Sequence, residues 1–327
     1  MALLEVDNLC VQLQTQRGPA KAVRAVSFKL ERGETLGLIG ESGCGKSITA
    51  MALMGLLPER AVVTGSIRFE QQQLVGMNDA SLRQLRGDRI GMIFQEPMTA
   101  LNPVHTIGHQ VAEPLLLHRG ASVKAARSQA IALLDRVGIA DAARRFDAYP
   151  HQFSGGQRQR ITIAMALACG PDLLIADEPT TALDVTIQGQ ILDLISELVQ
   201  ERGMALILIS HDLGVIAQNV SRMLVMYGGT VVESGPTQAV FERLAHPYTR
   251  GLFGARPQLG AARGRRLTTI EGSVPELVDL PAGCPFFERC PLAIAACANT
   301  LPAPTDLGQS HQASCLRLDA VPTGAPA

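Results

Sequence analysis

A glycine-rich stretch that ends in a lysine and a serine offers the clearest chemistry in this sequence. It reads GESGCGKS and fits the pattern G-x-x-x-x-G-K-[S/T]. Backbone N–H groups of such a loop bind phosphate oxygens, the lysine reaches the outer phosphates, and the serine hydroxyl is a natural Mg²⁺ ligand. A glycine-rich turn without a ligand is the alternative. The residues expected to hold a nucleoside triphosphate and its magnesium are Gly40, Glu41, Ser42, Gly43, Cys44, Gly45, Lys46, Ser47 and Ile48.

Two adjacent acids follow the apolar run 173–176. An acidic residue at the carboxyl end of a buried parallel strand lies beside the phosphate loop in such folds. We therefore expect Asp177 to help hold Mg²⁺ through water and Glu178 to act as the general base that polarises the attacking water. Acids after a strand are also common helix N-caps, which is the alternative interpretation.

A serine and two glycines at 154–156 precede Gln157 and a helical pattern. Ser154 and the amides of Gly155 and Gly156 at a helix N-terminus are expected to form a second anion site. The alternative is a serine N-cap followed by a flexible glycine pair.

These residues require a sheet edge and several helix starts to position them. Apolar alternation predicts strands over 2–13 and 22–30, and helical spacing over 105–168 predicts a helical insertion. Further strands are expected over 35–39, 65–69, 89–94, 173–176 and 205–209, helices over 48–57 and 187–199, and a hairpin over 223–233. The segment 254–327 is rich in Pro, Gly and Ala and shows little periodicity.

Composition excludes several classes of partner. The 327 residues carry 29 basic and 30 acidic side chains, so bulk charge gives no reason to expect nucleic acid or an anionic membrane surface. No uncharged run approaches the roughly 18 residues of a membrane-spanning helix. The N-terminal residues lack the basic region of a signal peptide, and we expect a cytosolic chain whose membrane role comes through partners.

The stretch Phe153-Ser-Gly-Gly-Gln157 resembles the signature motif of the ATP-binding cassette (ABC) ATPases, usually L-S-G-G-Q. The resemblance covers residues 3–250. It implies an α/β fold with a parallel phosphate-loop core, an antiparallel β subdomain and a helical subdomain at about 105–170, within a domain spanning 1–250. In that family the signature contacts the γ-phosphate bound by an opposite subunit, so ATP joins two cassettes head to tail.

The same resemblance assigns roles to other residues. Gln95 matches the Q-loop glutamine, which binds Mg²⁺ together with Ser47 and touches the membrane partner. Asp184, in Ala182-Leu183-Asp184, matches the loop that crosses the dimer interface, and His211 matches the switch histidine. A histidine after a strand is more often structural when it stands alone. The residues expected to carry catalysis are Glu178, His211, Gln95 and Lys46.

One departure from the family concerns the base. ABC proteins usually stack adenine on an aromatic side chain from the first strands, whereas no Tyr, Trp or Phe precedes Phe28 here. The nearest positions are Leu13, Thr15 and Lys21, so adenine is expected to pack on aliphatic groups or on Arg24.

Three further stretches resemble the ATPases of bacterial dipeptide and oligopeptide importers. They are the extended Q-loop Gln95–Pro103, the segment His246–Thr249 and the cysteine-containing tail, which implies a small Cys-rich C-terminal domain over 251–327. The resemblance implies a second ATPase subunit in a heterodimer, two transmembrane permeases, an extracytoplasmic binding protein and a place on the cytoplasmic face of the inner membrane. Nickel, glutathione or a sugar are alternative solutes, and a soluble ABC ATPase acting on ribosomes or DNA is the rival class.

Cysteines concentrate in the tail. The spacing of Cys284, Cys290, Cys297 and Cys315 lacks the C-x-x-C pairs of tight zinc sites and departs from the common ferredoxin run. Because some members of the resembled family bind a [4Fe–4S] cluster there, a structural cluster is expected, with zinc or unliganded thiols as alternatives. Cys44 is interpreted as a small filler of the phosphate loop, and a reactive thiol is the alternative.

Overall fold

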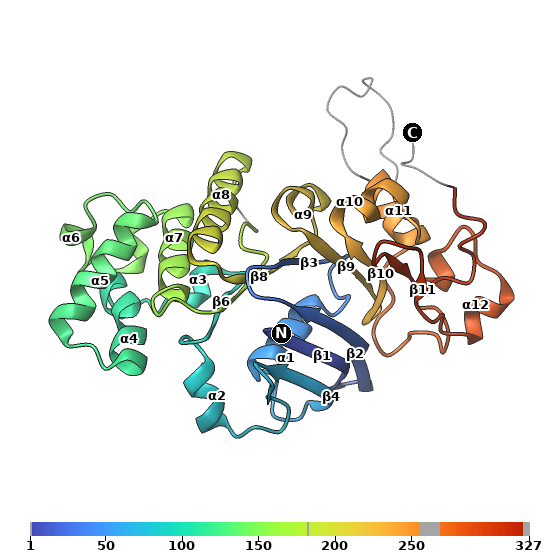
Figure 1. Cartoon of the computed structure of the whole chain (residues 1–327), viewed down its shortest axis with the longest axis horizontal. Coiled ribbons are helices and arrows are strands. Elements are labelled where there is room, and N and C mark those ends of the chain that lie inside the picture. The colour runs from blue at the N-terminus through green and yellow to red at the C-terminus, as the bar shows by residue number, and fades with distance from the viewer. Residues whose placement is uncertain (1, 182, 256–268, 323–327) are drawn as a thin grey trace. The chain divides into compact units, whose positions relative to one another are not determined.

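The computed structural model describes residues 2–181, 183–255 and 269–322, and the chain forms two compact units. The first unit comprises Met1–Leu4, Leu30–Thr35 and Phe69–Ile209, and the second comprises Glu5–Lys29, Leu36–Arg68 and Ser210–Ala327. Each unit is therefore built from segments that lie far apart in the sequence (Figure 1). The domain boundary expected at 250/251 stays a prediction.

A parallel sheet forms the core of the first unit. It consists of β6 (Ile90–Ile93), β7 (Leu173–Asp177) and β8 (Ala205–Ser210), and β7 pairs in parallel with both neighbours. All residues of the three strands are buried, as expected for apolar runs covered on both faces. The carboxyl end of β7 therefore carries Asp177 to a defined sheet edge.

Helices make up most of the rest of the first unit. The helical insertion predicted over 105–168 holds α4, α5, α6 and α7, which lie together in Figure 1, with α4 packed against α5 and α7. Side-chain caps begin three of these helices: Thr106 for α4, Ser122 for α5 and Ser154 for α7. The elements are β5 (Gln72–Gln73), α2 (Asp79–Leu85), α3 (Pro97–Ala100), α4 (Ile107–Arg119), α5 (Val123–Arg136), α6 (Ala142–Arg145), the 3₁₀ turn η1 (Pro150–Gln152), α7 (Gly155–Ala166) and α8 (Val185–Arg202).

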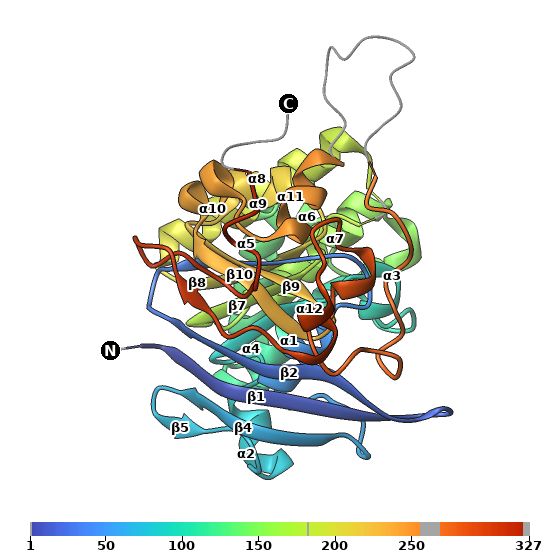
Figure 2. The same cartoon turned by 90° about the vertical axis from the view of Figure 1, so that its right-hand side faces the viewer.

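An antiparallel layer opens the second unit. The strands β1 (Leu4–Thr15), β2 (Gly18–Leu30) and β4 (Val62–Phe69) lie in the order β2-β1-β4, as Figure 2 shows. The buried positions of β1 shift by one residue at Asn8, which has a φ of 48° and donates its N–H to Ser27 Oγ at 2.8 Å. An extra residue in the left-handed region restores burial of the apolar residues that follow.

The second sheet of this unit combines parallel and antiparallel pairs. β3 (Thr35–Ile39) pairs in parallel with β9 (Arg222–Tyr227), and β9 forms the predicted hairpin with β10 (Thr230–Pro236). Positive φ angles at Gly228 and Gly229 permit the tight turn. The tail adds β12 (Gln312–Ala313) to β10 and β11 (Thr305–Asp306) to β12. These two short strands were not predicted from the sequence.

Helices and an aromatic cluster complete the second unit. Tyr227 lies 4.6 Å from Tyr248 and 5.1 Å from Phe286 between ring centroids, so the tail packs onto β9 through aromatic contacts. The elements are α1 (Lys46–Met54), α9 (Leu213–Asn219), α10 (Thr237–Arg243), α11 (Pro247–Gly254), the 3₁₀ turn η2 (Phe287–Arg289) and α12 (Ala295–Asn299).

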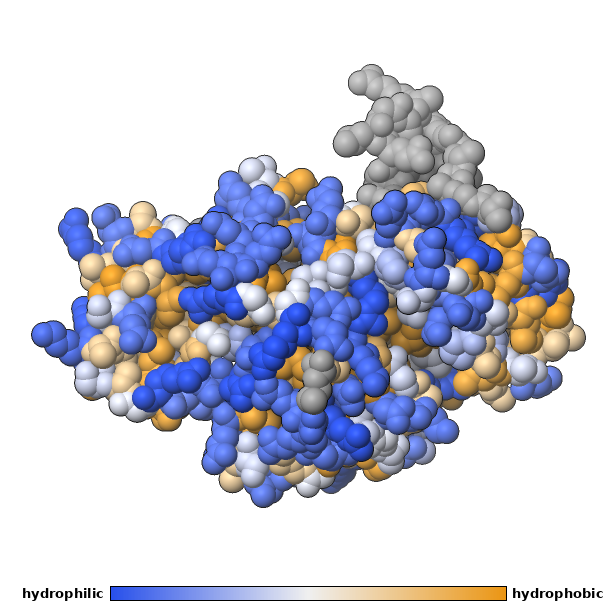
Figure 3. Space-filling view, viewed as in Figure 1, coloured by the Kyte–Doolittle hydropathy of each residue, from blue (hydrophilic) through white to orange (hydrophobic). Residues whose placement is uncertain are grey.

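Hydrophilic side chains cover most of the face in Figure 3, with hydrophobic ones in scattered patches. The most exposed large apolar side chains, such as Val185, Val123 and Leu117, are separate from one another in the sequence. Within the described ranges, no helix has the length and apolar character needed to cross a bilayer.

Candidate functional site

The phosphate loop connects the carboxyl end of β3 to the first turn of α1. Gly40, Gly43 and Gly45 have φ angles of 153°, 82° and 101°. A side chain at Gly40 would clash with the Met226 carbonyl oxygen, and one at Gly45 would clash with that of Ala22. The loop conformation therefore requires glycine, both for its backbone angles and for space.

Lys46 lies across the loop that it follows. Its Nζ donates to the carbonyl oxygens of Gly40 at 2.8 Å and Glu41 at 3.0 Å, and only 4% of the residue is exposed. An ammonium group has three N–H donors, which allows Lys46 Nζ to bond both carbonyl oxygens. The positive charge of the side chain therefore lies inside the glycine-rich turn. Ser47 and Ile48 continue α1 and are half-buried.

One residue of the loop, Glu41, has partners in the tail and in the helix α11 that precedes it. The Arg289 guanidinium donates to both Glu41 carboxylate oxygens, at 2.8 and 3.1 Å, and the Glu41 N–H donates to Tyr248 Oη at 2.8 Å. The Glu41 side chain thus has a structural partner. Sequence reasoning missed Arg289 and Tyr248. The sequence did offer one signal, the acidic Glu41 inside an anion-binding loop. A carboxylate in that position needs a nearby cation to compensate its charge.

Cys44 is fully buried, and burial raises the pKa of its thiol despite the nearby ammonium of Lys46. A raised pKa disfavours the reactive thiolate. The Cys44 carbonyl accepts the Gly229 N–H at 3.1 Å, which ties the loop to the β9–β10 turn. These observations favour the filler interpretation of Cys44.

The first unit brings Gln95 and Glu178 together. Gln95 Nε2 donates to Glu178 Oε2 at 3.2 Å, and Thr181 Oγ1 donates to the same oxygen at 2.9 Å. Glu178 has a φ of 46°, and its N–H donates to the Ile209 carbonyl at 3.0 Å. A non-glycine residue in the left-handed region is uncommon and indicates a constrained position. Thr181 was missed in the sequence, where a threonine after two acids carries no distinctive signal.

Asp177 and Glu178 differ in exposure because they lie on either side of the strand end. Asp177 is the last residue of β7 and is 5% exposed, whereas Glu178 is half-buried. Neither residue begins a helix, so the N-cap interpretation of this pair is wrong.

Ser154 caps α7 with a reciprocal pair of bonds. Its Oγ accepts the Gln157 N–H at 3.4 Å, and Gln157 Oε1 accepts the Ser154 N–H at 3.1 Å. The serine N-cap is what the alternative interpretation predicted, and Gln157 extends it to a capping box, but Ser154 and Gly155 remain exposed at the helix start. The helix N-terminus is thus open to an anion from outside.

The remaining expected residues lie at the ends of other elements. Asp184 caps α8 by accepting the Ile187 N–H at 3.0 Å, while Ala182 lies outside the described residues. His211 follows β8 and is exposed.

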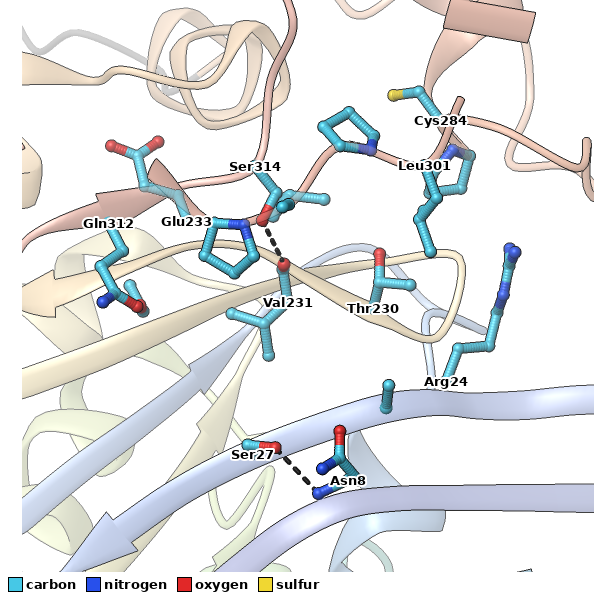
Figure 4. Close-up of a pocket in the computed structure, with 17 residues that line it drawn as sticks. Asn8, Arg24, Ser27, Thr230, Val231, Glu233, Cys284, Leu301, Gln312 and Ser314 are labelled. Carbon is cyan, nitrogen blue, oxygen red and sulfur yellow. Dashed lines mark hydrogen bonds between the residues drawn. The ribbon is translucent and has the colours of Figure 1, made fainter. Parts of the chain in front are cut away.

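Of the residues considered for the base, Leu13, Thr15 and Arg24 line two different pockets, whereas Lys21 is exposed and lines neither of them. Leu13 and Thr15 line a cavity together with Ser42 and Gly43 of the phosphate loop. Arg24 lines a different pocket of about 400 Å³ (Figure 4), and its Nη1 is buried without a hydrogen-bond partner among the described residues. Figure 4 places Arg24 opposite Thr230 and the tail residues Cys284 and Leu301.

The four tail cysteines carry free thiols. Burial raises the pKa of Cys284 to about 11, and the thiols of Cys290, Cys315 and Cys297 add to the shift. The Cys284 N–H donates to the Cys297 carbonyl at 2.8 Å. Across the described parts of the chain, no group of three or more His, Cys, Asp or Glu side chains is arranged to hold a metal ion. The predicted [4Fe–4S] ligation therefore finds no ready ligand set.

Comparison with known proteins gives two family matches. Residues 23–181 match the family described as "ABC transporter", and residues 232–297 match "Oligopeptide/dipeptide transporter, C-terminal region". Together these matches include the signature stretch and most of the cysteine tail.

Similar proteins carry corresponding names. The chain is 50% identical over 315 residues to the dipeptide transport ATP-binding protein DppD of Bacillus subtilis (strain 168), covering 96% of this chain and 94% of that protein. It is 48% identical over 320 residues to the oligopeptide transport ATP-binding protein OppD of Mycobacterium tuberculosis (strain ATCC 25618 / H37Rv), covering 98% of this chain and 52% of that protein.

Solved structures show a similar fold. The dimeric structure of MJ0796, a bacterial ABC transporter cassette, is 29% identical with a TM-score of 0.64, covering 72% of this chain and 98% of that one. A dimeric post-hydrolysis state of the same cassette bound to ADP and Pi matches with 28% identity and the same TM-score. With the phosphate loop and the ordered motifs in place, the chain belongs to the ABC transporter ATP-binding proteins, in the group that includes the dipeptide and oligopeptide transport ATPases.

Proposed function

We propose that this chain is the ATP-hydrolysing subunit of a bacterial ABC importer that takes up dipeptides or oligopeptides. The observation that carries the proposal is the glycine-dependent phosphate loop with Lys46 held across it, in a chain 50% identical to a dipeptide transport ATP-binding protein. Hydrolysis of ATP would power the movement of partner permeases.

Each predicted residue has a chemical role in this proposal. Lys46 and the loop amides bind the β- and γ-phosphates, and Ser47, Gln95 and Asp177 are the groups that would hold Mg²⁺. The metal ion would neutralise charge on the phosphates. Glu178 accepts the proton of the attacking water while Gln95 and Thr181 orient its carboxylate. His211 would contact the γ-phosphate.

A second cassette would complete the site. The start of α7, where Ser154 and Gly155 are exposed and Gly156 and Gln157 are half-buried, offers amides to a γ-phosphate bound by another subunit. Asp184 would lie at the interface. The dimeric cassette structures support this arrangement. The partners are then a second, different ATPase subunit, two transmembrane permeases and, through them, an extracytoplasmic binding protein, at the cytoplasmic face of the membrane.

Substituting Glu178 with Gln tests the enzymatic part of the proposal. The amide keeps the size of the side chain but accepts no proton, so we expect ATP turnover by the purified subunit with its partner to fall at least about 100-fold while ATP still binds. Wild-type turnover in the variant would contradict the assigned role. Uptake of a labelled dipeptide by a strain that lacks this protein tests the substrate, and we expect that uptake to be lost. If the strain instead loses uptake of nickel, glutathione or a sugar, that solute is the substrate.

We also propose that the tail cysteines ligate a [4Fe–4S] cluster that staples the segment 251–327. The thiols of Cys290, Cys297 and Cys315 are near enough to raise the pKa of Cys284, so four soft ligands occupy one region of the second unit. Because these thiols do not form a ready ligand set in the described structure, ligation would require local movement of the tail. Anaerobically purified protein should contain iron and sulfide and absorb near ~400 nm. Stoichiometric zinc without iron would contradict this proposal.

A further inference from the structure

A cavity of about 570 Å³ adjoins the phosphate loop in the second unit. Two parts of the chain line it. One part comprises Leu13, Thr15 and Ala20 of the first two strands with Ser42 and Gly43 of the loop, and the other is the tail segment 274–278. A volume between about 300 and 1,000 Å³ is typical of small-molecule sites.

The tail segment presents an apolar surface to this cavity. Val274, Pro275, Leu277 and Val278 are each half-buried, while Glu276 is exposed. None of the residues that line the described cavity is aromatic. Aliphatic groups on two sides suit a flat ring system with apolar faces, which gains dispersion contacts on both.

An arginine joins the two sides of the cavity. Arg17, at the β1–β2 turn, donates to Glu276 at 2.7 Å and to both carboxylate oxygens of Asp279 at 2.8 and 2.7 Å. A bidentate arginine–carboxylate pair sets orientation as well as distance. We call Arg17, Glu276 and Asp279 the tail clasp. The pair between Arg289 and Glu41 fixes the same tail to the phosphate loop.

We propose that the segment 274–278 forms the second wall of the base site for ATP, and that the tail clasp positions it. The inference rests on the proposed function, because the phosphate loop must hold the triphosphate for the base to enter the adjoining cavity. The base would then lie between Leu13 and Thr15 on one side and the tail valines on the other. In this chain the tail supplies the contacts for which an aromatic side chain is absent in residues 1–27.

Comparing ATP with inorganic tripolyphosphate separates base contacts from phosphate contacts. In the full-length protein, the double substitution Glu276→Gln and Asp279→Asn should raise the Kd for ATP about tenfold and leave the Kd for tripolyphosphate within about twofold, because only the base contacts are lost. The matched control is Glu197→Gln with Glu201→Gln, which removes the two acids that pair with Arg136 in the first unit. The control should change neither affinity.

A second variant tests the wall itself. Val274→Asn with Val278→Asn places uncharged polar groups beside the base and should also weaken ATP but not tripolyphosphate. Circular dichroism and thermal unfolding confirm that the variants are folded. Equal weakening of both ligands, or unchanged ATP affinity in both variants, would overturn the inference. Failure of the wild-type protein to bind tripolyphosphate would instead overturn the proposed phosphate site.

Discussion

Cys44 and Lys46 lie two positions apart in the same loop but have different roles. Both are buried, but the ammonium of Lys46 is bonded to two carbonyls of the turn, whereas burial raises the pKa of the Cys44 thiol. The pattern of the phosphate loop was recognisable in the sequence because glycine, lysine and serine are each required at their positions. The raised pKa of the Cys44 thiol could not be recognised in the sequence, because it depends on burial by segments that are distant along the chain.

We predict that Cys44 resists alkylation in the folded protein. Because its thiol pKa is raised, the thiolate fraction at pH 7.5 is smaller than that of an ordinary cysteine. Mass spectrometry after brief iodoacetamide treatment should find label at half-exposed Cys10 and at Cys44 only after unfolding. Rapid labelling of native Cys44 that ATP prevents would show the reactive thiol instead.

Thr181 is predicted to position the Glu178 carboxylate. Its hydroxyl donates to the oxygen that also accepts Gln95, so Thr181→Ala removes one of two orienting bonds. We expect kcat for ATP hydrolysis to fall about tenfold, with the Kd for ATP unchanged. Thr181→Ser, which keeps the hydroxyl, should restore most of the rate. An equal loss in both variants would indicate a packing role.

At the scale of elements, buried Glu233 joins three parts of the second unit. Its carboxylate on β10 accepts the N–H groups of Ala245 and His246 at 2.8 Å each and contacts His311 Nε2 at 2.8 Å. Glu233 therefore connects a strand, the start of α11 and the tail residue that directly precedes β12. Removing one partner of a buried ionic group costs about 3–5 kcal/mol. Glu233→Ala should lower the free energy of unfolding by this amount in urea denaturation, and Glu233→Gln by less.

His246, whose N–H group is bonded to Glu233, makes the stability of the protein depend on pH. Burial lowers its pKa from 6.5 to about 4, so between these values the unfolded chain binds more protons than the folded one. The free energy of unfolding should therefore fall as the pH drops from about 6.5 to about 4, by at most about 1.4 kcal/mol per unit. His246→Asn, which retains a capping side chain, should flatten this slope in urea titrations. Parallel slopes in both proteins would contradict the prediction.

The elements differ in how far the sequence could predict them. The buried strands of the first unit and the β9–β10 hairpin follow from apolar runs and paired glycines. The strands β11 and β12 could not be predicted, because two residues have no periodicity and their pairing depends on β10. For the same reason the tail clasp and the Arg289–Glu41 pair, which join residues more than 200 positions apart, left no local pattern.

At the scale of the whole molecule, the proposed function requires ATP to be held between this chain and a second cassette. The phosphate loop lies in one unit and the signature start of α7 in the other, and the similar solved cassettes are dimeric. Ser154 would act only in the assembled pair. Ser154→Arg should therefore abolish ATP-dependent assembly while each subunit still binds ATP.

The most direct measurement is sedimentation of the Glu178→Gln protein with its partner ATPase subunit, with and without Mg·ATP. We expect a one-to-one complex that forms only with nucleotide and retains it after gel filtration, and we expect that complex to be lost when Ser154→Arg is added. Subunits that remain separate in Mg·ATP, while the wild-type chain hydrolyses ATP equally well alone and with its partner, would contradict it.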